Sequence, residues 1–354
     1  MTVPVPTPTA APVLLDLRSD TVTKPTAAMR RAMADAEVGD DVLEGDPTTR
    51  RLEAAVAERL GKEAALFFPS GSMANQAAIW VHAAPGTEIL VDADAHIYHW
   101  EIAAAAALCG VQCRPVRGET PVMRAKDLRA WIRTPSIHAP EPSLVCLENT
   151  HNGAGGMITP LDELRALEKV ARSVSLPVHL DGARLWNAAA ATGTSLADFA
   201  ACADTVMLSF SKGLGAPVGA CLVGPAAFMT QAHRARKRFG GGMRQSGILA
   251  AAALHALDKH LERLHEDHAA ARALADLVDG VGGARVVPPD SNILMIDLPE
   301  PKGAAVVARA AELGVRLSLW HPGRVRAVTH LDAPLDAVRA HGGRVVQALE
   351  EALA

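Results

Sequence analysis

The segment Thr205-Val-Met-Leu-Ser-Phe-Ser-Lys-Gly-Leu-Gly215 places a lysine directly after a short apolar run. Thr205–Ser209 has the length and apolar character of a buried strand, and the glycines after it allow a tight turn of the backbone. A lysine at the end of such a strand lies in a low-dielectric pocket, where its pKa should fall and its neutral amine can condense with an aldehyde. The segment therefore predicts Lys212 as a reactive amine at a strand end.

A second apolar strand, in Val178-His-Leu-Asp-Gly-Ala-Arg184, ends on an aspartate. A buried carboxylate is costly unless a cation or hydrogen-bond donors compensate it. Taken alone, the segment fits equally well a structural ion pair between Asp181 and Arg184. However, Asp181 lies one strand–helix unit before Lys212, on a nearby strand end, and an aspartate there can pair with the protonated pyridine nitrogen of a pyridoxal ring. Asp181 and Lys212 together predict a pyridoxal phosphate site.

A third strand, Ala64–Phe68, leads into Pro69-Ser-Gly-Ser72 and then a helix that extends to about Ala83. A helix N-terminus offers unpaired N–H groups and a positive dipole end, which suit a phosphate. The segment lacks the lysine of a Walker motif, which disfavours a nucleoside triphosphate site. On its own this pattern is more typical of ordinary helix capping.

Short apolar runs separated by helical patterns continue along the chain, which predicts a buried, mostly parallel sheet with helices on both faces. Ligands bind beyond the carboxyl ends of the strands in such α/β folds. The remaining strands that we predict in this part of the chain are 88–91, 143–147 and 219–223.

After Gly247 the pattern changes to one long predicted helix over 248–278, followed by short strand-like runs at 292–298, 315–318 and 326–329. This pattern indicates a smaller α+β domain. We therefore predict a flexible N-terminal arm, a large cofactor-binding domain and a small C-terminal domain, over residues 1–13, 14–250 and 251–354.

The composition narrows the class of protein. The net charge of −4 disfavours a sequence-independent grip on nucleic acid, and no apolar stretch has the length that a membrane span needs. Five scattered cysteines without a CxxC pair favour reduced thiols in a cytoplasmic protein. The tetrad His265-Glu-Asp-His268 lacks the HExxH spacing, so we predict no metal site.

Taken together, these segments resemble the low-specificity L-threonine aldolases, pyridoxal phosphate enzymes of the aspartate-aminotransferase fold type I. The resemblance extends from residue 16 to residue 332 and so covers nearly the whole chain. It implies cleavage of L-threonine, L-allo-threonine or a related β-hydroxy-α-amino acid to glycine and an aldehyde. Besides the Asp181 and Lys212 motifs, the matching segments are Asp16–Thr23, Val38–Val42, Leu147–Gly153, Phe239–Gly247 and Val328–Asp332.

The resemblance also implies roles for individual residues. Lys212 would hold the cofactor and Asp181 its ring nitrogen, while His96 would stack on the ring and border the β-hydroxyl group of the substrate. The phosphate would be bound by Gly71 and by Ser72, where many relatives carry threonine. The residues implied to bind the substrate carboxylate are Ser19, Arg184 and Arg326, of which Arg184 would also contact the cofactor. The phosphate contacts implied to come from a second subunit are Lys237 and Arg244, in a homodimer or homotetramer with the site at the subunit interface.

The base that removes the β-hydroxyl proton stays open at this point. His96 is the first candidate, because the pKa of histidine lies near the working pH. His138 is the second candidate, and a water molecule between the two histidines is a third. A β-eliminating lyase or a threonine transaldolase would carry the same lysine and aspartate. A non-catalytic ligand-binding module would be expected to lack the Schiff-base lysine or the residues that clamp a carboxylate, and this sequence has both.

Overall fold

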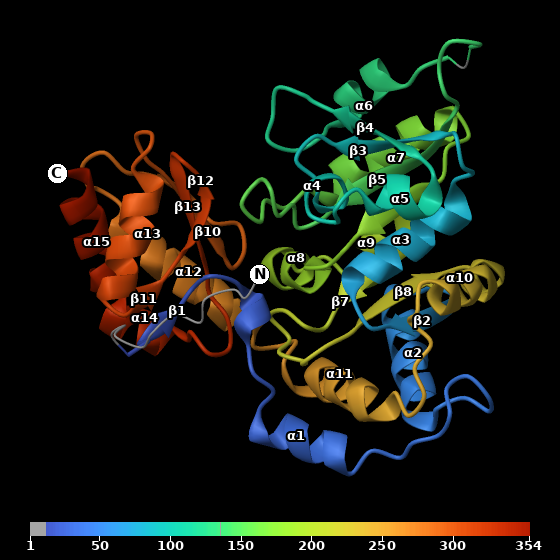
Figure 1. The fold of residues 1–354 in the computed structure, drawn as a ribbon, viewed down its shortest axis with the longest axis horizontal. Helices are drawn as coiled ribbons and strands as arrows, with labels where there is room; N and C mark the ends of the chain where they lie inside the picture. The colour runs from blue at the N-terminus through green and yellow to red at the C-terminus, as the bar shows by residue number, and fades with distance from the viewer. Residues whose placement is uncertain (1–11, 135) are drawn as a thin grey trace, which may run out of the picture. The chain divides into compact units, whose positions relative to one another are not determined.

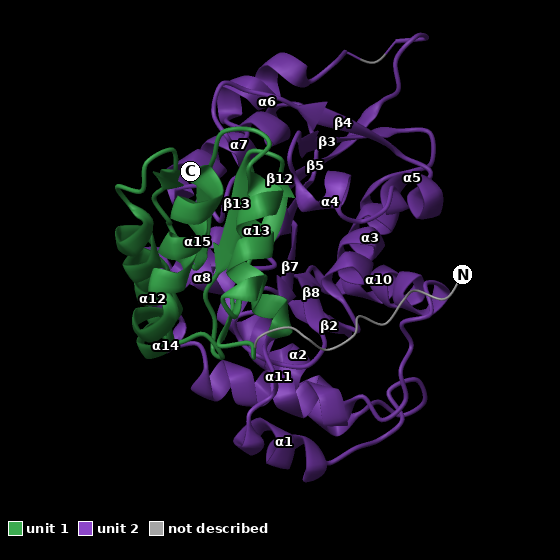
Figure 2. Ribbon diagram, turned by 60° about the vertical axis from the view of Figure 1, so that its left-hand side comes forward, with its two compact units in different colours: residues 1–22, 266–354 green, residues 23–265 purple. Residues whose placement is uncertain are grey.

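The computed structural model describes residues 12–134 and 136–354, so the arm predicted for residues 1–13 lies almost wholly outside the described residues. The chain forms two compact units (Figure 2). Unit 2 comprises residues 23–265, and unit 1 combines residues 12–22 with residues 266–354. The domain boundary predicted at 250/251 differs from this division, in which 251–265 cluster with unit 2 and 14–22 with unit 1.

Unit 2 is built on a seven-stranded sheet in the order β2-β8-β7-β6-β5-β3-β4 (Figure 1). β8 runs antiparallel to both of its neighbours, β2 and β7, and the other strand pairs are parallel, so the prediction of a mostly parallel sheet is confirmed. The strands are β2 (Ala64–Phe68), β3 (Glu88–Asp92), β4 (Gln112–Val116), β5 (Pro142–Glu148), β6 (Val178–Asp181), β7 (Thr205–Ser209) and β8 (Ala220–Gly224).

Helices flank this sheet and supply its hydrophobic layers. Asp46 begins α2 as predicted, because its carboxylate accepts from Thr49 N at 2.9 Å and Pro47 occupies the first helical position. The helices are α1 (Ala27–Ala34), α2 (Pro47–Leu60), α3 (Gly71–His82), α4 (His96–His99), α5 (Ala104–Cys109), α6 (Ala125–Trp131), α7 (Leu161–Ser173), α8 (Leu185–Thr192), α9 (Leu196–Ala201), α10 (Ala226–Arg238) and α11 (Gly247–Lys259).

The two-residue period of the strands decides which side chains face which layer. In β6, Val178 and Leu180 belong to the hydrophobic cluster that includes buried residues of α2, α7 and α9. The alternate residues of β6, His179 and Asp181, are therefore on the opposite face. Met207 of β7 packs on that opposite face against alanines of α3. Polar side chains of β6 and β7 thus meet α3.

The long helix predicted for 248–278 is instead two helices, since α11 ends at Lys259 and α12 spans Leu264–Val278. The break has a tertiary cause. His260 follows the last residue of α11 and its Nδ1 donates to the carbonyl of Leu214, at 2.7 Å, in the loop after the lysine. That contact draws the chain out of the helical path at a place with neither glycine nor proline.

Unit 1 has the α+β character that the sequence predicted. Its four-stranded antiparallel sheet has the order β12-β13-β10-β9, and β1 pairs in parallel with β11. No helix among residues 12–134 and 136–354 is both long and apolar enough to cross a bilayer. The elements of unit 1 are β1 (Leu15–Asp16), η1 (Asp20–Val22), β9 (Arg285–Val287), β10 (Ile293–Asp297), α13 (Gly303–Glu312), β11 (Val315–Arg316), β12 (Ser318–His321), β13 (Arg324–Val328), α14 (Leu335–His341) and α15 (Gly343–Leu353), besides most of α12.

Candidate active site

A pocket lies beyond the carboxyl ends of β6 and β7, at the N-terminus of α3. This is where the α/β rule places a ligand. The structure therefore brings together five of the residues singled out from the sequence, namely Gly71, Ser72, His96, Asp181 and Lys212. The other lining residues are Ser70, Asn75, Ala183, Met207, Ser209 and Ser211.

The loop that carries Lys212 is held in place from several sides. Trp186 Nε1 donates to the carbonyl of Ser209 at 2.9 Å, which anchors the end of β7. Gly215 N donates to the carbonyl of Lys212 at 2.8 Å and closes the turn. Together with the bond from His260 to Leu214, these contacts give the lysine backbone one defined position at the pocket.

Asp181 and Glu101 are two buried carboxylates that share one amide donor. Asn75 Nδ2 donates to Asp181 Oδ2 at 2.8 Å and to Glu101 Oε1 at 2.9 Å. Ala183 N donates to the other oxygen of Asp181, Oδ1, at 3.0 Å, and Gln76 Nε2 donates to the other oxygen of Glu101, Oε2, at 2.6 Å. Hydrogen bonds of this kind compensate the burial of a carboxylate, so Asp181 in the pocket and Glu101 behind it are both satisfied.

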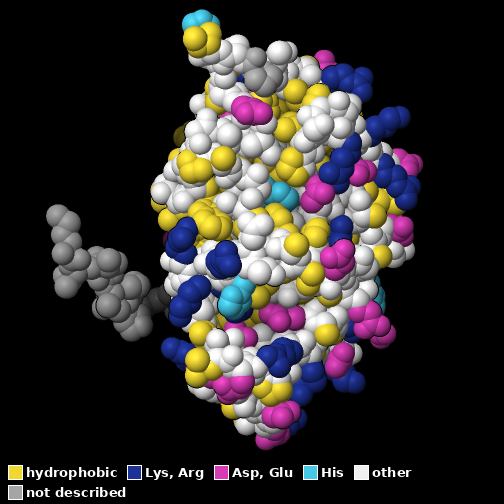
Figure 3. Space-filling view, turned by 90° about the vertical axis from the view of Figure 1, so that its right-hand side faces the viewer, with side chains coloured by type: hydrophobic (Ala, Val, Ile, Leu, Met, Phe, Trp, Pro, Cys, Tyr) yellow, Lys and Arg dark blue, Asp and Glu magenta, His cyan; other side chains and the backbone are white. Residues whose placement is uncertain are grey.

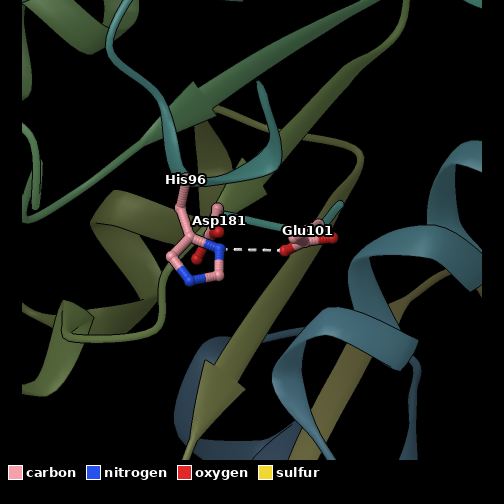
Figure 4. A group of neighbouring side chains, drawn as sticks. All are labelled: His96, Glu101 and Asp181. Atoms are coloured by element: carbon pink, nitrogen blue, oxygen red, sulfur yellow. Dashed lines mark hydrogen bonds and ion pairs between the residues drawn. The ribbon is translucent and has the colours of Figure 1, made fainter. Parts of the chain in front are cut away.

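His96 faces the same pocket from α4, and Figure 4 shows its ring directed at Glu101. His96 Nδ1 lies 3.0 Å from Glu101 Oε1, and this contact orients the imidazole ring. Because Nδ1 of His96 is hydrogen-bonded to Glu101, Nε2 is the ring nitrogen that can accept a proton from a ligand. Burial would lower the pKa of His96, but its hydrogen bond to Glu101 and the charges of Asp181 and Glu101 outweigh burial and raise that pKa.

The N-terminus of α3 forms the end of the pocket that suits an anion. Ser70 is the N-cap, and its hydroxyl accepts from Met73 N at 3.2 Å. The N–H groups of Gly71 and Ser72 precede the first intrahelical bonds and point out of the helix end. The hydroxyls of Ser209 and Ser211, 3.3 Å apart, lie in the same pocket. A side chain at Gly71 would crowd Met207, since a Cβ there would lie 3.1 Å from its Cε.

Three side chains of this pocket have the residue types of a metal site. Ligand atoms of His96, Glu101 and Asp181 lie within 4.8 Å of one another (Figure 4). Amide and backbone N–H groups already point at the oxygens of both carboxylates, and a cation would have to displace these donors. The cluster is therefore arranged to receive hydrogen bonds and to face a positively charged ring or imidazole.

Lys237 and Arg244 lie outside the pocket in their own subunit. Lys237, near the end of α10, lines a separate hollow with Val42 and Arg234, and basic side chains gather on the face of unit 2 shown in Figure 3. Arg244 is exposed and pairs with Asp40 at 3.0 Å. Neither cation reaches the phosphate end of the pocket within one subunit.

His138 is likewise not part of this pocket. It is exposed beside Ile137, which is 95% exposed, in the segment between α6 and β5 (Figure 1). This loop precedes β5, whereas the pocket lies beyond the carboxyl ends of the parallel strands. A strand the length of β5 separates the two edges of the sheet by about 20 Å.

The three residues predicted for the substrate carboxylate divide between the units. Arg184 of unit 2 is buried just before α8, where its Nη1 donates to Asn152 Oδ1 at 3.3 Å. Ser19 and Arg326 belong to unit 1. There the hydroxyl of Ser19 accepts from Thr21, and Arg326 covers the ring of Trp320 with its guanidinium carbon 4.7 Å from the ring centre.

The sequence alone did not single out Asn75, His179 or Met207. Asn75 is the third residue after the segment Pro69–Ser72 and four residues after Gly71, which places it on the same side of the helix as Gly71. This helical spacing is the signal that could have identified it. His179 lies two positions before Asp181 and therefore on the same face of β6. The two-residue period would have placed both side chains beneath α3.

A known protein family and its members match the chain over most of its length. A family model described as β-eliminating lyase matches residues 16–301. The low specificity L-threonine aldolase of Escherichia coli (strain K12) is 41% identical over 332 residues, covering 93% of this chain and 98% of the relative.

Solved structures show the same fold. A threonine aldolase from Leishmania major superposes with a TM-score of 0.76 at 22% identity, covering 96% of this chain and 100% of that one. A serine palmitoyltransferase variant from S. paucimobilis, solved with bound PLP and myriocin, superposes with a TM-score of 0.75 at 20% identity, covering 95% of this chain and 87% of that one. The prediction of a fold-type I α/β architecture is thereby confirmed.

Proposed function

The chain belongs to the β-eliminating lyase family, and from that premise we propose that it uses pyridoxal 5′-phosphate to cleave L-threonine or L-allo-threonine into glycine and acetaldehyde. The observation that carries the proposal is the meeting of Lys212, Asp181 and the N-terminus of α3 in one pocket. The high identity to low-specificity L-threonine aldolases over nearly the whole chain supports the substrate class.

The residues of the pocket match the three functional groups of the cofactor. Lys212 offers the amine for the aldehyde, and Asp181 offers a carboxylate for the ring nitrogen. Gly71 and Ser72 offer N–H groups at a helix N-terminus for the phosphate. When bound, pyridoxal phosphate supplies the electron sink that takes up the pair of electrons released as the Cα–Cβ bond breaks.

The chain's own residues then position the substrate and move one proton. His96 Nε2 takes the proton of the β-hydroxyl group, and Glu101 holds the ring in the tautomer and orientation that this requires. Arg184 pairs with the substrate carboxylate through its guanidinium, and Ser19 and Arg326 stay predicted carboxylate ligands. His138 stays a predicted second base, but only for the pocket of a neighbouring subunit, because it lies far from its own.

We further propose that the active unit is a homodimer or homotetramer. Lys237 and Arg244 are cations outside their own pocket, which supports a role at the cofactor phosphate of a partner subunit. All five cysteines are thiols and four are buried, which supports a reducing compartment, and we assign the protein to the cytoplasm.

The reaction is tested with purified protein, pyridoxal phosphate and L-threonine or L-allo-threonine. We expect equal amounts of glycine and acetaldehyde. Release of ammonia with a 2-oxo acid would instead identify a β-eliminating lyase, and transfer of the glycine unit to an added aldehyde would identify a transaldolase. Since these reactions share Lys212 and Asp181, only the products separate them.

Lys212→Ala is the test of cofactor attachment. We expect the variant to lose the visible absorbance of the bound cofactor, because no other residue assigned to the pocket carries an amine. An unchanged spectrum in the variant would contradict the assignment of Lys212.

His96→Gln is the test of the base. We expect kcat to fall by about 10²–10⁴-fold while the visible absorbance persists, because general base catalysis contributes on that order. A variant that retains full kcat would exclude His96 and move the role to a histidine of the partner subunit or to water.

A further inference from the structure

A continuous row of hydrogen bonds runs between α3 and the sheet, behind the pocket. His82 Nε2 lies 2.9 Å from the hydroxyl of Thr205, and the same hydroxyl lies 2.9 Å from His179 Nδ1. His179 Nε2 lies 3.1 Å from Asn75 Oδ1. Asn75 then reaches Asp181 and Glu101. Every bond of the row lies within unit 2.

The secondary structure explains why these residues meet. Asn75 and His82 are seven residues apart on α3 and so share one side of the helix, about 10 Å apart along its axis. His179 and Asp181 lie on the same face of β6. Thr205 precedes Val206 in β7, and because Val206 packs on the opposite face of the sheet, Thr205 lies on the same face as His179. Thr205, His179 and Asn75 are fully buried. The row thus extends from the amino end of β7 to the pocket at the carboxyl end of β6.

The two carboxylates decide the direction of the bonds. Because the amide nitrogen of Asn75 donates to both Asp181 and Glu101, its oxygen faces His179. His179 Nε2 therefore carries a hydrogen and donates it to Asn75. Burial lowers the pKa of His179 to about 4, so at neutral pH its Nδ1 has no hydrogen and accepts from Thr205.

The same logic extends to the last member. Since the hydroxyl hydrogen of Thr205 points at His179, its oxygen can only accept from His82, whose Nε2 therefore carries a hydrogen. Burial lowers the pKa of His82 to about 3, which keeps this ring neutral too. Each member donates to the next, and the row ends on the side chains of Asp181 and Glu101.

Resting on the proposed binding of pyridoxal phosphate at Asp181, we propose that His82, Thr205, His179 and Asn75 are positioning residues that act as a one-way hydrogen-bond chain. The chain fixes the amide of Asn75 with both hydrogens toward Asp181 and Glu101. It thereby keeps the carboxylate of Asp181 hydrogen-bonded and aimed at the ring nitrogen, and that of Glu101 aimed at His96. If His179 adopted its other tautomer, its lone pair would face the oxygen of Asn75 and the amide would be driven to turn over.

The first experiment reads the tautomers in the wild-type holoenzyme. With ¹⁵N-histidine labelling, His82→Gln and His179→Gln assign the two signals by their disappearance. We expect both rings to be neutral and protonated on Nε2 at pH 7. A His179 ring protonated on Nδ1, or on both nitrogens, would overturn the proposal whether or not the protein cleaves threonine.

The second experiment compares variants that keep or remove single links. Glutamine places an amide nitrogen near the position of Nε2 and asparagine near that of Nδ1, so His179→Gln keeps the donor to Asn75 and His179→Asn removes it. Thr205→Ser keeps the hydroxyl, and Thr205→Val removes it with the same shape. The probe is pyridoxal phosphate labelled with ¹⁵N in the ring, and its affinity for the apo form of each variant is measured in parallel.

We expect His179→Asn and Thr205→Val to bind the cofactor about tenfold more weakly, and their ring ¹⁵N signal to move toward that of the unprotonated nitrogen. His179→Gln and Thr205→Ser should retain the wild-type signal. If the two disruptive variants fold, by circular dichroism, and keep both the signal and the affinity, the proposal is wrong. Should His179→Asn fail to fold, the isosteric Thr205→Val carries the test together with the tautomer measurement. A wild-type protein that binds no pyridoxal phosphate would instead contradict the proposed function.

Discussion

At the residue scale, each polar side chain at the pocket is held in position by a hydrogen bond to a neighbouring side chain. Glu101 touches His96 and shares the Asn75 amide with Asp181. One carboxylate thus balances a histidine and the other is available for a cationic ring. This division explains how two buried acids can occupy one pocket without either being left unpaired.

Glu101→Gln should shift the pH dependence of the reaction. A raised pKa means that His96 is protonated, and unable to act as a base, up to a higher pH than an ordinary histidine. Removing the Glu101 charge lowers that pKa, so the acid limb of the kcat/KM profile should move to lower pH. Glu119→Gln, an exposed acid paired with Lys126, is the matched control and should leave the limb in place. An unmoved limb in Glu101→Gln would argue that another group titrates in it.

At the scale of elements, contacts between helices and strands change the properties of individual side chains. Glu53 of α2 reaches β2, where its carboxylate accepts from Phe67 N at 2.8 Å. Burial raises the pKa of Glu53 to about 7 from the ordinary 4.5, which the nearby Arg236 only partly opposes. The folded protein therefore binds more protons than the unfolded chain between these values, and its free energy of unfolding falls as pH rises through the window.

Glu53→Gln should relieve this penalty. A shift from 4.5 to about 7 corresponds to about 3 kcal/mol for a fully buried group. Because the side chain is only half-buried, we expect a gain of about 1–2 kcal/mol at pH 8 and none at pH 4. Denaturant unfolding at both pH values measures the gain, and Glu58→Gln, exposed on the same helix, is the control. Equal stability of wild type and variant at pH 8 would show that Glu53 carries no such penalty.

His260 joins the end of α11 to the loop that follows Lys212, and replacing it should destabilise that loop. His260→Leu loses the bond from Nδ1 to the Leu214 carbonyl, leaving a buried acceptor, which costs about 1–3 kcal/mol. Asparagine offers a donor near the position of Nδ1, so His260→Asn should recover part of that loss. Thermal unfolding measures stability, and cofactor affinity should fall in the same order. The prediction is contradicted if leucine and asparagine variants behave alike.

At the scale of the whole molecule, the proposed role of Lys237 and Arg244 at the cofactor phosphate of a partner subunit predicts a site shared between two subunits. Mixing inactive Lys212→Ala with inactive Arg244→Ala, after denaturation and refolding together, should restore activity. In a random mixture of dimers, half of the molecules are hybrids with one intact site, so about a quarter of wild-type activity is expected. Mixing Lys212→Ala with Asp181→Ala is the control and should restore none. No recovery in the first mixture would show that Arg244 serves its own subunit.

Much of the fold could be predicted from the sequence because buried strands and helices have recognisable patterns of apolar residues. The runs that became β2 and β7 were predicted to the residue, since strands buried on both faces are continuously apolar. β4 was missed because Gln112, Arg114 and Pro115 interrupt its apolar pattern, and most of the strand is only partly buried. The single long helix predicted after Gly247 was wrong because the bond that interrupts it comes from the lysine loop.

Some residues of the candidate site could likewise be predicted from local sequence patterns, and others could not. Lys212, Asp181, Gly71 and Ser72 could be found from the sequence because they stand at strand ends and a helix start, which local patterns mark. The choice of Asn75 as the shared donor, the burial of Glu101 and the exposure of His138 were decided only by the tertiary structure. These depend on which faces of α3 and β6 meet and on which edge of the sheet a loop lies, and such pairings join residues about 100 positions apart that no local pattern relates.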